Sequence, residues 1–390
     1  MRSVPLVEVA LPKGLIGGPF GSSLGKKDYV SSGIPVIRGQ NLAGSGRFSL
    51  DDLVFVTEAK AASELARNLA EPGDVIFTQR GTLGQVGVVP KQPYTKYVIS
   101  QSQMRLRVDP DKADATYIYY CFLDAGMQDT IRSHAITTGV PHINLGILAE
   151  LRVPLPPLPE QHAIAEVLGT LDDKIEANDE IVRTCSDLAA AQFRIAAQGR
   201  TSLAEVASIT MGQSPPGSSY NELGDGAPFF QGTRDFGFRH PRRRVWCNAP
   251  TRFANATDSL VSVRAPVGRV NTASERCAIG RGLAAARSAF PSVLYQALTA
   301  EPWVWSPFES EGTVFGAIDK AQFAAIRLPW PTTTQDVAQL EETLARFDRL
   351  VDAIGQEDRV LASLRGVLLP KLLSGELRVR DAELLVEQAV

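Results

Sequence analysis

Residues 159–198 read PEQHAIAEVLGTLDDKIEANDEIVRTCSDLAAAQFRIAAQ, and this stretch decides the fold. Its apolar residues recur at alternating spacings of four and three, with Asn178 taking one turn of the stripe: Ile164, Leu168, Leu171, Ile175, Val182 and Cys185. Such a heptad pattern is typical of a helix that packs along another helix. At about 1.5 Å per residue this helix is roughly 60 Å long, so we interpret it as a spacer.

A second heptad pattern lies near the end of the chain and stops at Ser374-Gly375, a typical helix end. Its apolar residues are Val337, Leu340, Leu344, Phe347, Val351, Ile354, Leu361, Leu364, Leu368 and Leu372. Two such helices in one chain predict an antiparallel two-helix coiled coil that carries two domains, with Leu171, Ile175, Phe347 and Val351 in its seam or against a partner's helices. The alternative is that each helix packs on its own domain.

The segments before the two helices resemble each other, which indicates an internal duplication. GIPVIRG (33–39) returns as GAPFFQG (226–232), and GDVIFTQRGTLGQV (73–86) returns as TDSLVSVRAPVGRV (257–270). INLGILAELRVPLP (143–156) aligns without gaps with IDKAQFAAIRLPWP (318–331) at an offset of 175, and the helices align at 176, with Asp172 opposite Asp348. We therefore predict an α+β protein with two duplicated mixed α/β domains, residues 1–157 and 201–331, and two helical spacers, residues 158–200 and 332–390.

Within the first domain, the run 73–89 predicts a strand, a glycine hairpin and a second strand. Residues 58–70 and 114–135 predict helices, and prolines 154, 156, 157 and 159 form an elbow before the first spacer. The glycine-containing stretches 21–27 and 81–87 do not fit a nucleotide-binding site. Phe20 replaces the first glycine of a P-loop, and a strand follows GTLGQVG where a dinucleotide fold needs a helix.

The charge is segregated, although the 390-residue chain carries a net charge of only −3. Residues 1–157 carry a net charge of +2 and residues 201–331 a net charge of +3, whereas each spacer carries −4. Mildly basic domains are compatible with nucleic acid, because only the face that meets phosphate must be positive. We expect a cytoplasmic protein, since we find no export signal, no 18-residue apolar run and only scattered cysteines.

The sequence offers no catalytic constellation, and we expect no cofactor and no metal. The four histidines lie far apart, and no HExxH, GxSxG or calcium-loop motif occurs. Asp52, Glu58 and Lys60 loosely match a magnesium-nuclease spacing, but the second copy has no counterpart. The base-methylation motif of the Asn/Asp-Pro-Pro-aromatic type is also missing.

Polar donors instead recur just after short predicted strands in both copies. Arginine, glutamine and asparagine can bind base edges in the DNA major groove, and an arginine run suits the phosphate backbone. A solvated loop is the alternative for any one of them, but their repetition favours DNA contact. The candidate DNA-binding residues are Arg38, Gln40, Asn41, Gln79, Arg80, Thr82, Gln231, Thr233, Arg234, Arg242, Arg243, Arg264 and Arg269.

Four stretches together resemble the specificity subunit of type I restriction-modification systems. They are VPLPPLPEQHAIAEVLGTLDDKIEANDEI, LLPKLLSGELRV (368–379), GQSPPGSSYNELGDGAPFFQGTRDFG (212–237) and the GDVIFTQRGTLG hairpin. The resemblance implies two target-recognition domains that each read one half of a split site in double-stranded DNA. The second elbow, LPWPTTTQDVAQLE, departs from the pattern because it lacks Pro-Leu-x-Glu-Gln.

The resemblance also implies partners. The helices would dock methyltransferase subunits, normally two, through residues such as Leu168, Leu171, Ile175, Leu344, Phe347 and Val351. The assembly would then recruit an ATP-dependent restriction and translocation subunit. We therefore expect a non-catalytic DNA-recognition subunit that reads a bipartite, asymmetric site. The alternatives are a nuclease or self-contained methyltransferase, which the missing motifs disfavour, and a coiled-coil adaptor without DNA specificity.

Overall fold

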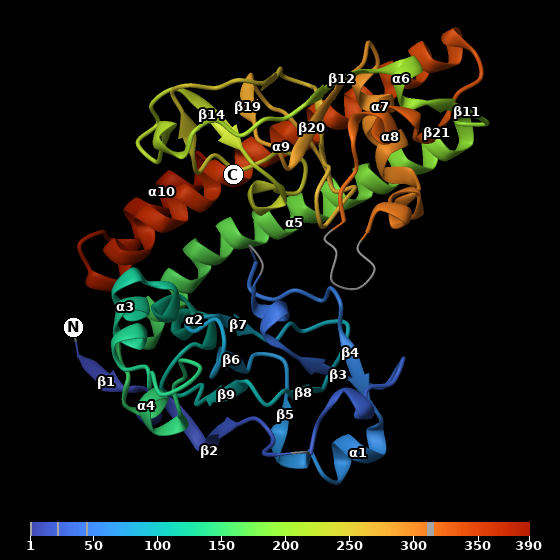
Figure 1. Cartoon of the computed structure of the whole chain (residues 1–390). Helices are drawn as coiled ribbons and strands as arrows, with labels where there is room; N and C mark the ends of the chain where they lie inside the picture. The colour runs from blue at the N-terminus through green and yellow to red at the C-terminus, as the bar shows by residue number, and fades with distance from the viewer. Residues whose placement is uncertain (1, 22, 44–45, 310–315) are drawn as a thin grey trace. The chain divides into compact units, whose positions relative to one another are not determined.

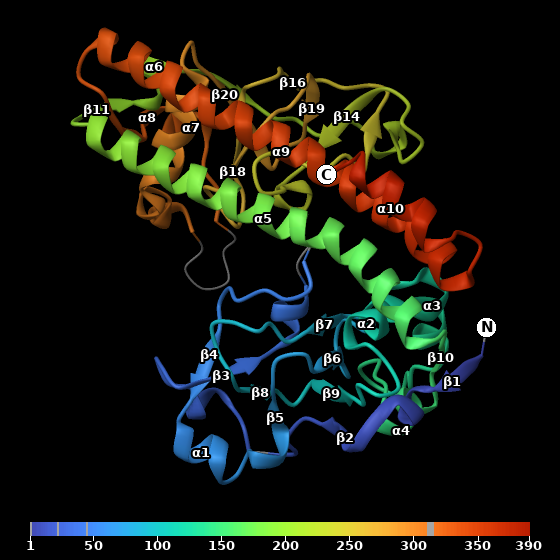
Figure 2. The ribbon, with the colours of Figure 1, turned by 180° about the vertical axis from the view of Figure 1, so that it is seen from behind.

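The computed structural model describes residues 2–21, 23–43, 46–309 and 316–390. The chain divides into two compact units: unit 1 comprises Met1–Glu180 and Gly355–Val390, and unit 2 comprises Ile181–Ile354. Each unit contains a mixed domain and a part of two long helices, α5 (Leu158–Ala196) and α9 (Thr334–Ser374), which Figures 1 and 2 show from opposite sides. The predicted fold class is confirmed.

Unit 1 builds its mixed domain from a two-stranded and two four-stranded sheets, within the described part of the chain. Their strand orders are β1-β10, β2-β9-β6-β7 and β4-β3-β8-β5, and β3 and β8 pair in parallel. The strands are β1 (Ser3–Pro5), β2 (Ala10–Gly17), β3 (Ile34–Ile37), β4 (Val54–Val56), β5 (Leu69–Ala70), β6 (Val75–Thr78), β7 (Val86–Val88), β8 (Tyr97–Ile99), β9 (Gln103–Val108) and β10 (Arg152–Pro154). The shorter helices are α1 (Glu58–Ala62), α2 (Ala115–Leu123), α3 (Ala125–Ser133), α4 (Leu145–Glu150) and α10 (Val379–Glu387).

Unit 2 repeats this topology strand for strand, with one additional strand, β13. Its sheets have the orders β11-β21, β12-β20-β17-β18 and β13-β15-β14-β19-β16, and β14 and β19 pair in parallel. The strands are β11 (Gly199–Ser202), β12 (Ser208–Met211), β13 (Tyr220–Asn221), β14 (Ala227–Phe230), β15 (Trp246–Cys247), β16 (Phe253–Ala254), β17 (Ser259–Ser262), β18 (Val270–Thr272), β19 (Cys277–Ile279), β20 (Leu283–Arg287) and β21 (Arg327–Trp330). The shorter helices are α6 (Leu203–Val206), α7 (Pro291–Ala300) and α8 (Lys320–Ala325).

The duplication extends to single contacts. The guanidinium of Arg107 binds both oxygens of the buried Asp74 carboxylate at 2.8 Å, and Arg287 binds Asp258 in the same way at 2.8 and 2.9 Å. Before β3 and β14, Gly33 (φ +142°) and Gly226 (φ +91°) lie so close to a neighbouring strand that a Cβ would be 2.3 Å from a carbonyl oxygen. Both copies therefore use the same framework.

The two long helices run antiparallel within each unit. In unit 1, Leu168 and Leu171 share one core with Leu361 and Leu368, and the side chain of Asn178 donates to Glu357 at 2.8 Å. The same core includes the domain's α2, so both packing modes expected from the sequence occur together. In unit 2, the core joins Ala189 and Phe193 of α5 to Val337, Leu340 and Leu344 of α9, together with strands and helices of the domain.

Two of three local expectations need correction. The predicted helix 114–135 is broken at Asp124, whose side chain accepts hydrogen bonds from the N–H groups of Gly126 and Met127 and so starts α3. The predicted helix 58–70 ends at Ala62, and a 3₁₀ turn (Ala66–Asn68) then leads into β5. The hairpin predicted for 73–89 is confirmed as β6 and β7.

The two elbows are built differently, as the sequence departure suggested. Gln161 is fully buried at the start of α5, and its amide donates to the Pro156 carbonyl at 2.8 Å and accepts from the Asp114 N–H at 3.0 Å. At the start of α9, the Thr333 hydroxyl accepts from the Asp336 N–H at 3.1 Å. The first elbow is therefore tied to α2 through a glutamine, whereas the second relies on a local threonine cap.

Among the described residues, none of the helices combines the length and the apolar character that crossing a membrane requires.

Candidate nucleic-acid interface

A single turn in unit 1 brings together the loops that carry the candidate residues. This turn, residues 100–103, joins β8 to β9 and is called central turn 1. Its backbone binds Ile37 (Ser100 N–H to carbonyl, 3.0 Å), Gln79 (N–H to Ser102 carbonyl, 2.7 Å) and Gly18 (N–H to Gln103 carbonyl, 2.8 Å). The chain after β3, β6 and β2 therefore meets at one edge.

Unit 2 forms the same arrangement around residues 280–283, which we call central turn 2. Here the Gly280 N–H donates to the Phe230 carbonyl at 2.8 Å and the Val263 N–H donates to the Gly282 carbonyl at 2.9 Å. The Gly212 N–H donates to the Leu283 carbonyl at 2.9 Å. The segments that begin at Arg38 and Gln79, and at Gln231 and Arg264, are thus neighbours within their own unit.

The candidate residues of unit 1 differ in how free their side chains are. Gln40 donates to the Asp52 carbonyl at 3.2 Å, and Arg38 donates to the same carbonyl. Asn41 is fully buried, accepts from the Arg38 N–H at 2.9 Å and donates to the carbonyls of Ser49 and Asp51, so its side chain shapes the loop. Arg80 and Thr82 are exposed at the hairpin, and Gln79 is half-buried.

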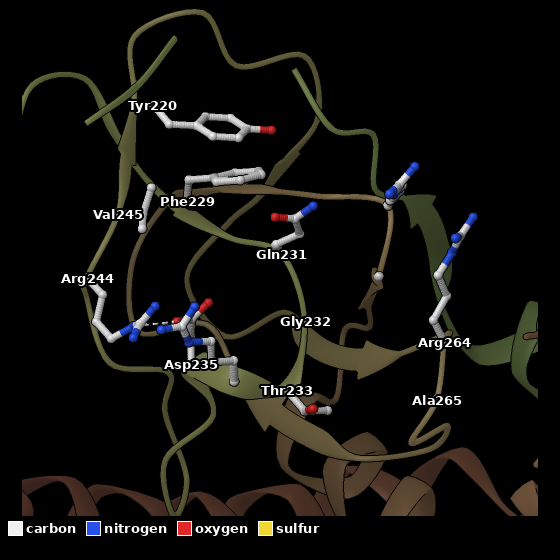
Figure 3. Close-up of a pocket in the computed structure, with 13 residues that line it drawn as sticks. Tyr220, Phe229, Gln231, Gly232, Thr233, Asp235, Arg244, Val245, Arg264 and Ala265 are labelled. Carbon is white, nitrogen blue, oxygen red and sulfur yellow. Dashed lines mark hydrogen bonds and ion pairs between the residues drawn. The ribbon is translucent and has the colours of Figure 1, made fainter. Parts of the chain in front are cut away.

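Four candidate residues of unit 2 line a common hollow of about 460 Å³: Gln231, Thr233, Arg234 and Arg264. At one end of this hollow the rings of Tyr220 and Phe229 are stacked, with centroids 4.7 Å apart and 23° between their planes. Figure 3 shows the two rings one above the other, with Gln231 beside them and Arg264 at the opposite end.

The three other candidates of unit 2 do not line the hollow. Arg242 and Arg269 are exposed, and Arg243 donates to Glu275 at 2.5 Å. Of the three consecutive arginines 242–244, the first two therefore lie outside the hollow. The third, Arg244, turns into it and binds the buried carboxylate of Asp235 at 2.8 Å.

Sequence reasoning missed the lining residues Tyr220, Phe229, Asp235 and Arg281, and it placed Arg244 only in the arginine run expected at the phosphate backbone. Arg281 belongs to central turn 2 and corresponds to Gln101 of central turn 1, so the alignment of the two copies could have found it. The aromatic pair gives no such signal, because Tyr220 and Phe229 come from different strands and the strand pairing brings them together.

The segment before β4 in unit 1 and the equivalent segment before β15 in unit 2 carry side chains of different charge. Val54 pairs with Val36 in unit 1, and the Phe229 N–H binds the Val245 carbonyl in unit 2, so Val54 and Val245 are equivalent. The residues just before them are Asp51-Asp52-Leu53 in unit 1 and Arg242-Arg243-Arg244 in unit 2. One framework therefore presents an acidic pair in one copy and three arginines in the other.

An ion pair ties a loop to a spacer helix in each unit, at equivalent helix positions. In unit 1, the Arg47 guanidinium binds Glu176 at 3.2 Å and also binds Asp173. Burial opposes the charge of Arg47, but its hydrogen bond to Glu176 and the two carboxylates hold the pKa of its guanidinium above the usual range. In unit 2, His240 binds Asp352 at 2.6 Å, and Glu176 and Asp352 differ by the offset of 176.

The residues expected to dock partner helices lie mostly inside this chain. Leu168, Leu171 and Ile175 are buried in the core of unit 1, and Leu344 in that of unit 2. Phe347 packs partly buried against the unit 2 core, and Val351 is half-buried. A second heptad series on α5 is exposed instead: Ile181, Leu188 and Ile195, with exposed fractions of 44%, 48% and 70%.

Within the described ranges, histidine, cysteine and acidic side chains form no group of three or more that could hold a metal ion. The four cysteines are free and buried.

Two copies of one mixed domain, each with polar loops gathered at a central turn, define a duplicated two-domain protein with paired helices. Comparison with known proteins shows what this chain is similar to. Residues 24–182 match the family model of the type I restriction modification DNA specificity domain. The chain is thus similar to the type I specificity subunits, and the resemblance predicted from its motifs is confirmed.

Individual relatives agree with this similarity. The chain is 27% identical to a Methanocaldococcus jannaschii protein described as the type I restriction enzyme MjaX specificity subunit, covering 91% of this chain and 90% of that protein. It is 26% identical to the MjaIX specificity subunit of the same organism over 42% of this chain and 37% of the relative. The crystal structure of the type I restriction-modification S subunit from M. genitalium shares the fold, with a TM-score of 0.58, 17% identity and 95% coverage of both chains.

Proposed function

We propose that this chain is the non-catalytic DNA-recognition subunit of a type I restriction-modification complex. The observation that carries the proposal is the repeated edge: in each unit, loops rich in arginine, glutamine and threonine converge on one central turn. Such side chains donate to base edges and phosphates. We assign residues 1–157 and 201–331 as the two target-recognition domains, each reading one half of the site.

The target that we propose is bipartite and asymmetric. Two domains from a duplication favour two half-sites separated by a gap, at about one helical turn or 10–10.5 bp centre to centre. The halves should differ, because Asp51-Asp52-Leu53 and Arg242-Arg243-Arg244 occupy equivalent places. We expect the gap to follow the length of the helical spacers, so that one additional turn in both would lengthen it by one or two base pairs.

The helices are the proposed docking site for methyltransferase subunits, two per complex, and the assembly would then bind a restriction and translocation subunit. The heptad residues Ile181, Leu188 and Ile195 support this, because they form an exposed apolar series on a helix whose other face is already packed. Leu171 and its seam partners would act indirectly, by holding the helix pair straight. Catalysis would reside in the partner subunits, so the isolated chain should methylate no DNA.

The test compares Arg80→Ala with Arg264→Ala in the complex reconstituted with its methyltransferase subunits. Both arginines follow equivalent strands, so each variant is the matched control of the other. We expect each to relax specificity at one half-site only, at a cost of about 1–3 kcal/mol for a base contact. Methylation-site sequencing reads the recognised motif, and competition binding gives the cost. A continuous or palindromic motif, or unchanged affinity in both variants, would contradict the proposal.

A second experiment addresses docking. Leu188→Lys should weaken methyltransferase binding without changing the stability of the chain, since Leu188 is exposed. Leu223→Lys is the control, because Leu223 is 93% exposed and belongs to the loop between β13 and β14, not to a helix. Pull-down and sedimentation of the complex measure binding. If binding persists in Leu188→Lys, the docking face is misassigned; if partners bind but no DNA sequence is discriminated, the chain is a coiled-coil adaptor.

A further inference from the structure

The hollow in unit 2 is lined by more arginines than its carboxylate can pair with. Arg234, Arg244, Arg264 and Arg281 all line it, and Asp235 is the carboxylate among the lining residues. Arg244 already forms an ion pair with Asp235, with 2.8 Å between its Nε and the carboxylate Oδ1. Within the described part of the chain, no acidic side chain pairs with Arg234, Arg264 or Arg281.

Two of these arginines are held next to each other by the backbone. The Val263 N–H donates to the Gly282 carbonyl at 2.9 Å, and the Arg281 N–H donates to the Ser214 hydroxyl at 3.3 Å. Arg264 follows Val263, and Arg281 precedes Gly282, so both side chains start from the same short segment of the edge. The backbone that carries the two arginines is therefore held in place by hydrogen bonds.

The mixture of lining groups favours a base edge over a phosphate. A phosphate uses donors alone, so it would leave the aromatic pair and the amide oxygen of Gln231 without a role. The amide of Gln231 and the stacked rings of Tyr220 and Phe229 instead match the polar edge and apolar face of a nucleobase. Among base edges in the major groove, guanine offers two acceptors, O6 and N7, and arginine can bind both.

Unit 1 lacks this concentration of free donors. Gln101 is the counterpart of Arg281, and its side-chain amide donates hydrogen bonds to the carbonyls of Gly21 and Leu24. Leu53 is at the position equivalent to Arg244. Arg38 is bound to the Asp52 carbonyl. The difference between the units is thus a difference in available arginines at equivalent positions.

We infer that the hollow of unit 2 is a guanine-reading pocket in which Arg281 and Arg264 contact the O6 and N7 edge of a guanine in that unit's half-site. The inference rests on the proposed function. It specifies one base of the target: the half-site read by unit 2 contains a guanine, on either strand, whose replacement is not tolerated.

The experiment uses the complete methyltransferase complex and synthetic duplexes carrying the recognised motif. Arg80→Ala first identifies the half-site read by unit 1, so the other half belongs to unit 2. Each guanine of that half is then replaced by 7-deazaguanine, which lacks the N7 acceptor, and separately its flanking phosphates are replaced by methylphosphonates. We expect one 7-deazaguanine to weaken binding about tenfold for the wild-type complex.

The variants Arg281→Ala and Arg281→Lys test the assignment. Arg281→Ala should bind the 7-deazaguanine and guanine duplexes with nearly equal affinity, whereas Arg281→Lys should retain part of the difference, because an ammonium can still donate to N7 but lacks the planar fork of arginine. The inference is overturned if the unit 2 half-site contains no guanine, if 7-deazaguanine has no effect, or if Arg281→Ala cancels only a methylphosphonate effect. Those results leave sequence-specific methylation intact, whereas a complex that discriminates no sequence would overturn the proposed function itself.

Discussion

The buried ion pair between Asp172 and Arg365 should control the stability of unit 1 and its dependence on pH. Asp172 lies fully buried in α5, accepts a hydrogen bond from the Tyr120 hydroxyl at 2.6 Å and binds the Arg365 guanidinium of α9. The three residues connect α2, α5 and α9. Burial raises the pKa of the Asp172 carboxyl above its usual range, although Arg365 and Tyr120 act in the opposite direction.

Arg365→Ala removes the cation and leaves a buried carboxylate with one neutral partner. Breaking a buried pair in this way costs about 3–5 kcal/mol of unfolding free energy. Because the folded state then binds a proton more tightly than the unfolded state, the stability of the variant is highest below the unfolded pKa of about 3.9 and falls as pH rises toward the folded pKa. The slope is at most about 1.4 kcal/mol per pH unit for one group.

The assay is hydrogen exchange of the full chain between pH 5 and 8, with unfolding in denaturant followed in parallel. We expect exchange to accelerate in α2, in residues 158–180 and in residues 355–374, all of which belong to unit 1, and to accelerate more at pH 8. Arg239→Ala is the internal control, because Arg239 binds Asp348, the counterpart of Asp172, at 2.7 Å in a partly exposed site and also covers the ring of Tyr295.

The double variant Asp172→Leu/Arg365→Met should recover most of the stability, since replacing both charges leaves none unpaired. A loss below about 1 kcal/mol in Arg365→Ala, comparable to a surface ion pair, would show that the pair is solvated. A loss that does not change between pH 5 and 8 would also refute the reasoning, because an uncompensated buried carboxylate must take up a proton as the pH falls.

Three further predictions concern single contacts. Phe193→Ala should destabilise unit 2 by about 3–5 kcal/mol, measured by denaturant unfolding, because Phe193 is buried in the core that joins α5 to α9. Burial lowers the pKa of His240, but its contacts with Asp352 and the Thr272 carbonyl raise it overall. The ion pair between His240 and Asp352 should therefore be complete below about pH 6.5 and be lost as pH rises through the folded pKa. Hydrogen exchange of residues 237–242 should follow that titration in the wild type and not in His240→Ala. Gln161→Leu should cost about 1–3 kcal/mol and loosen the first elbow only, read by exchange at residues 155–162, because it leaves the buried Asp114 N–H and Pro156 carbonyl without their partner.

The helical spacers could be predicted because heptad spacing depends only on local periodicity. Leu168, Leu171 and Ile175 are buried as their spacing requires, and Asn178 crosses the seam to Glu357. Which apolar residues remain exposed could not be predicted so well. Ile181, Leu188 and Ile195 form a second series whose exposure depends on where the domain cores cover the helix.

The candidate site was predictable to the extent that it follows strand ends. Arg80 and Arg264 were singled out because a residue after a strand keeps its place in both copies. Asn41 follows a strand equally well, but its short amide satisfies buried carbonyls inside the loop, and only the loop conformation shows this. The pairing of Tyr220 with Phe229 depends on long-range strand register, which no local pattern contains.

The central turns suggest how such a protein acquires a new target without a new fold. Backbone hydrogen bonds from residues 100–103 and 280–283 position the loops, so the framework does not depend on which side chains the loops carry. The buried Asp74–Arg107 and Asp258–Arg287 pairs stabilise this framework in both copies. Positions such as 52 and 243 can then carry opposite charges. Under the proposed function, recognition would lie in side chains and stability in backbone contacts and buried pairs, so each domain could change its half of the target independently of the other.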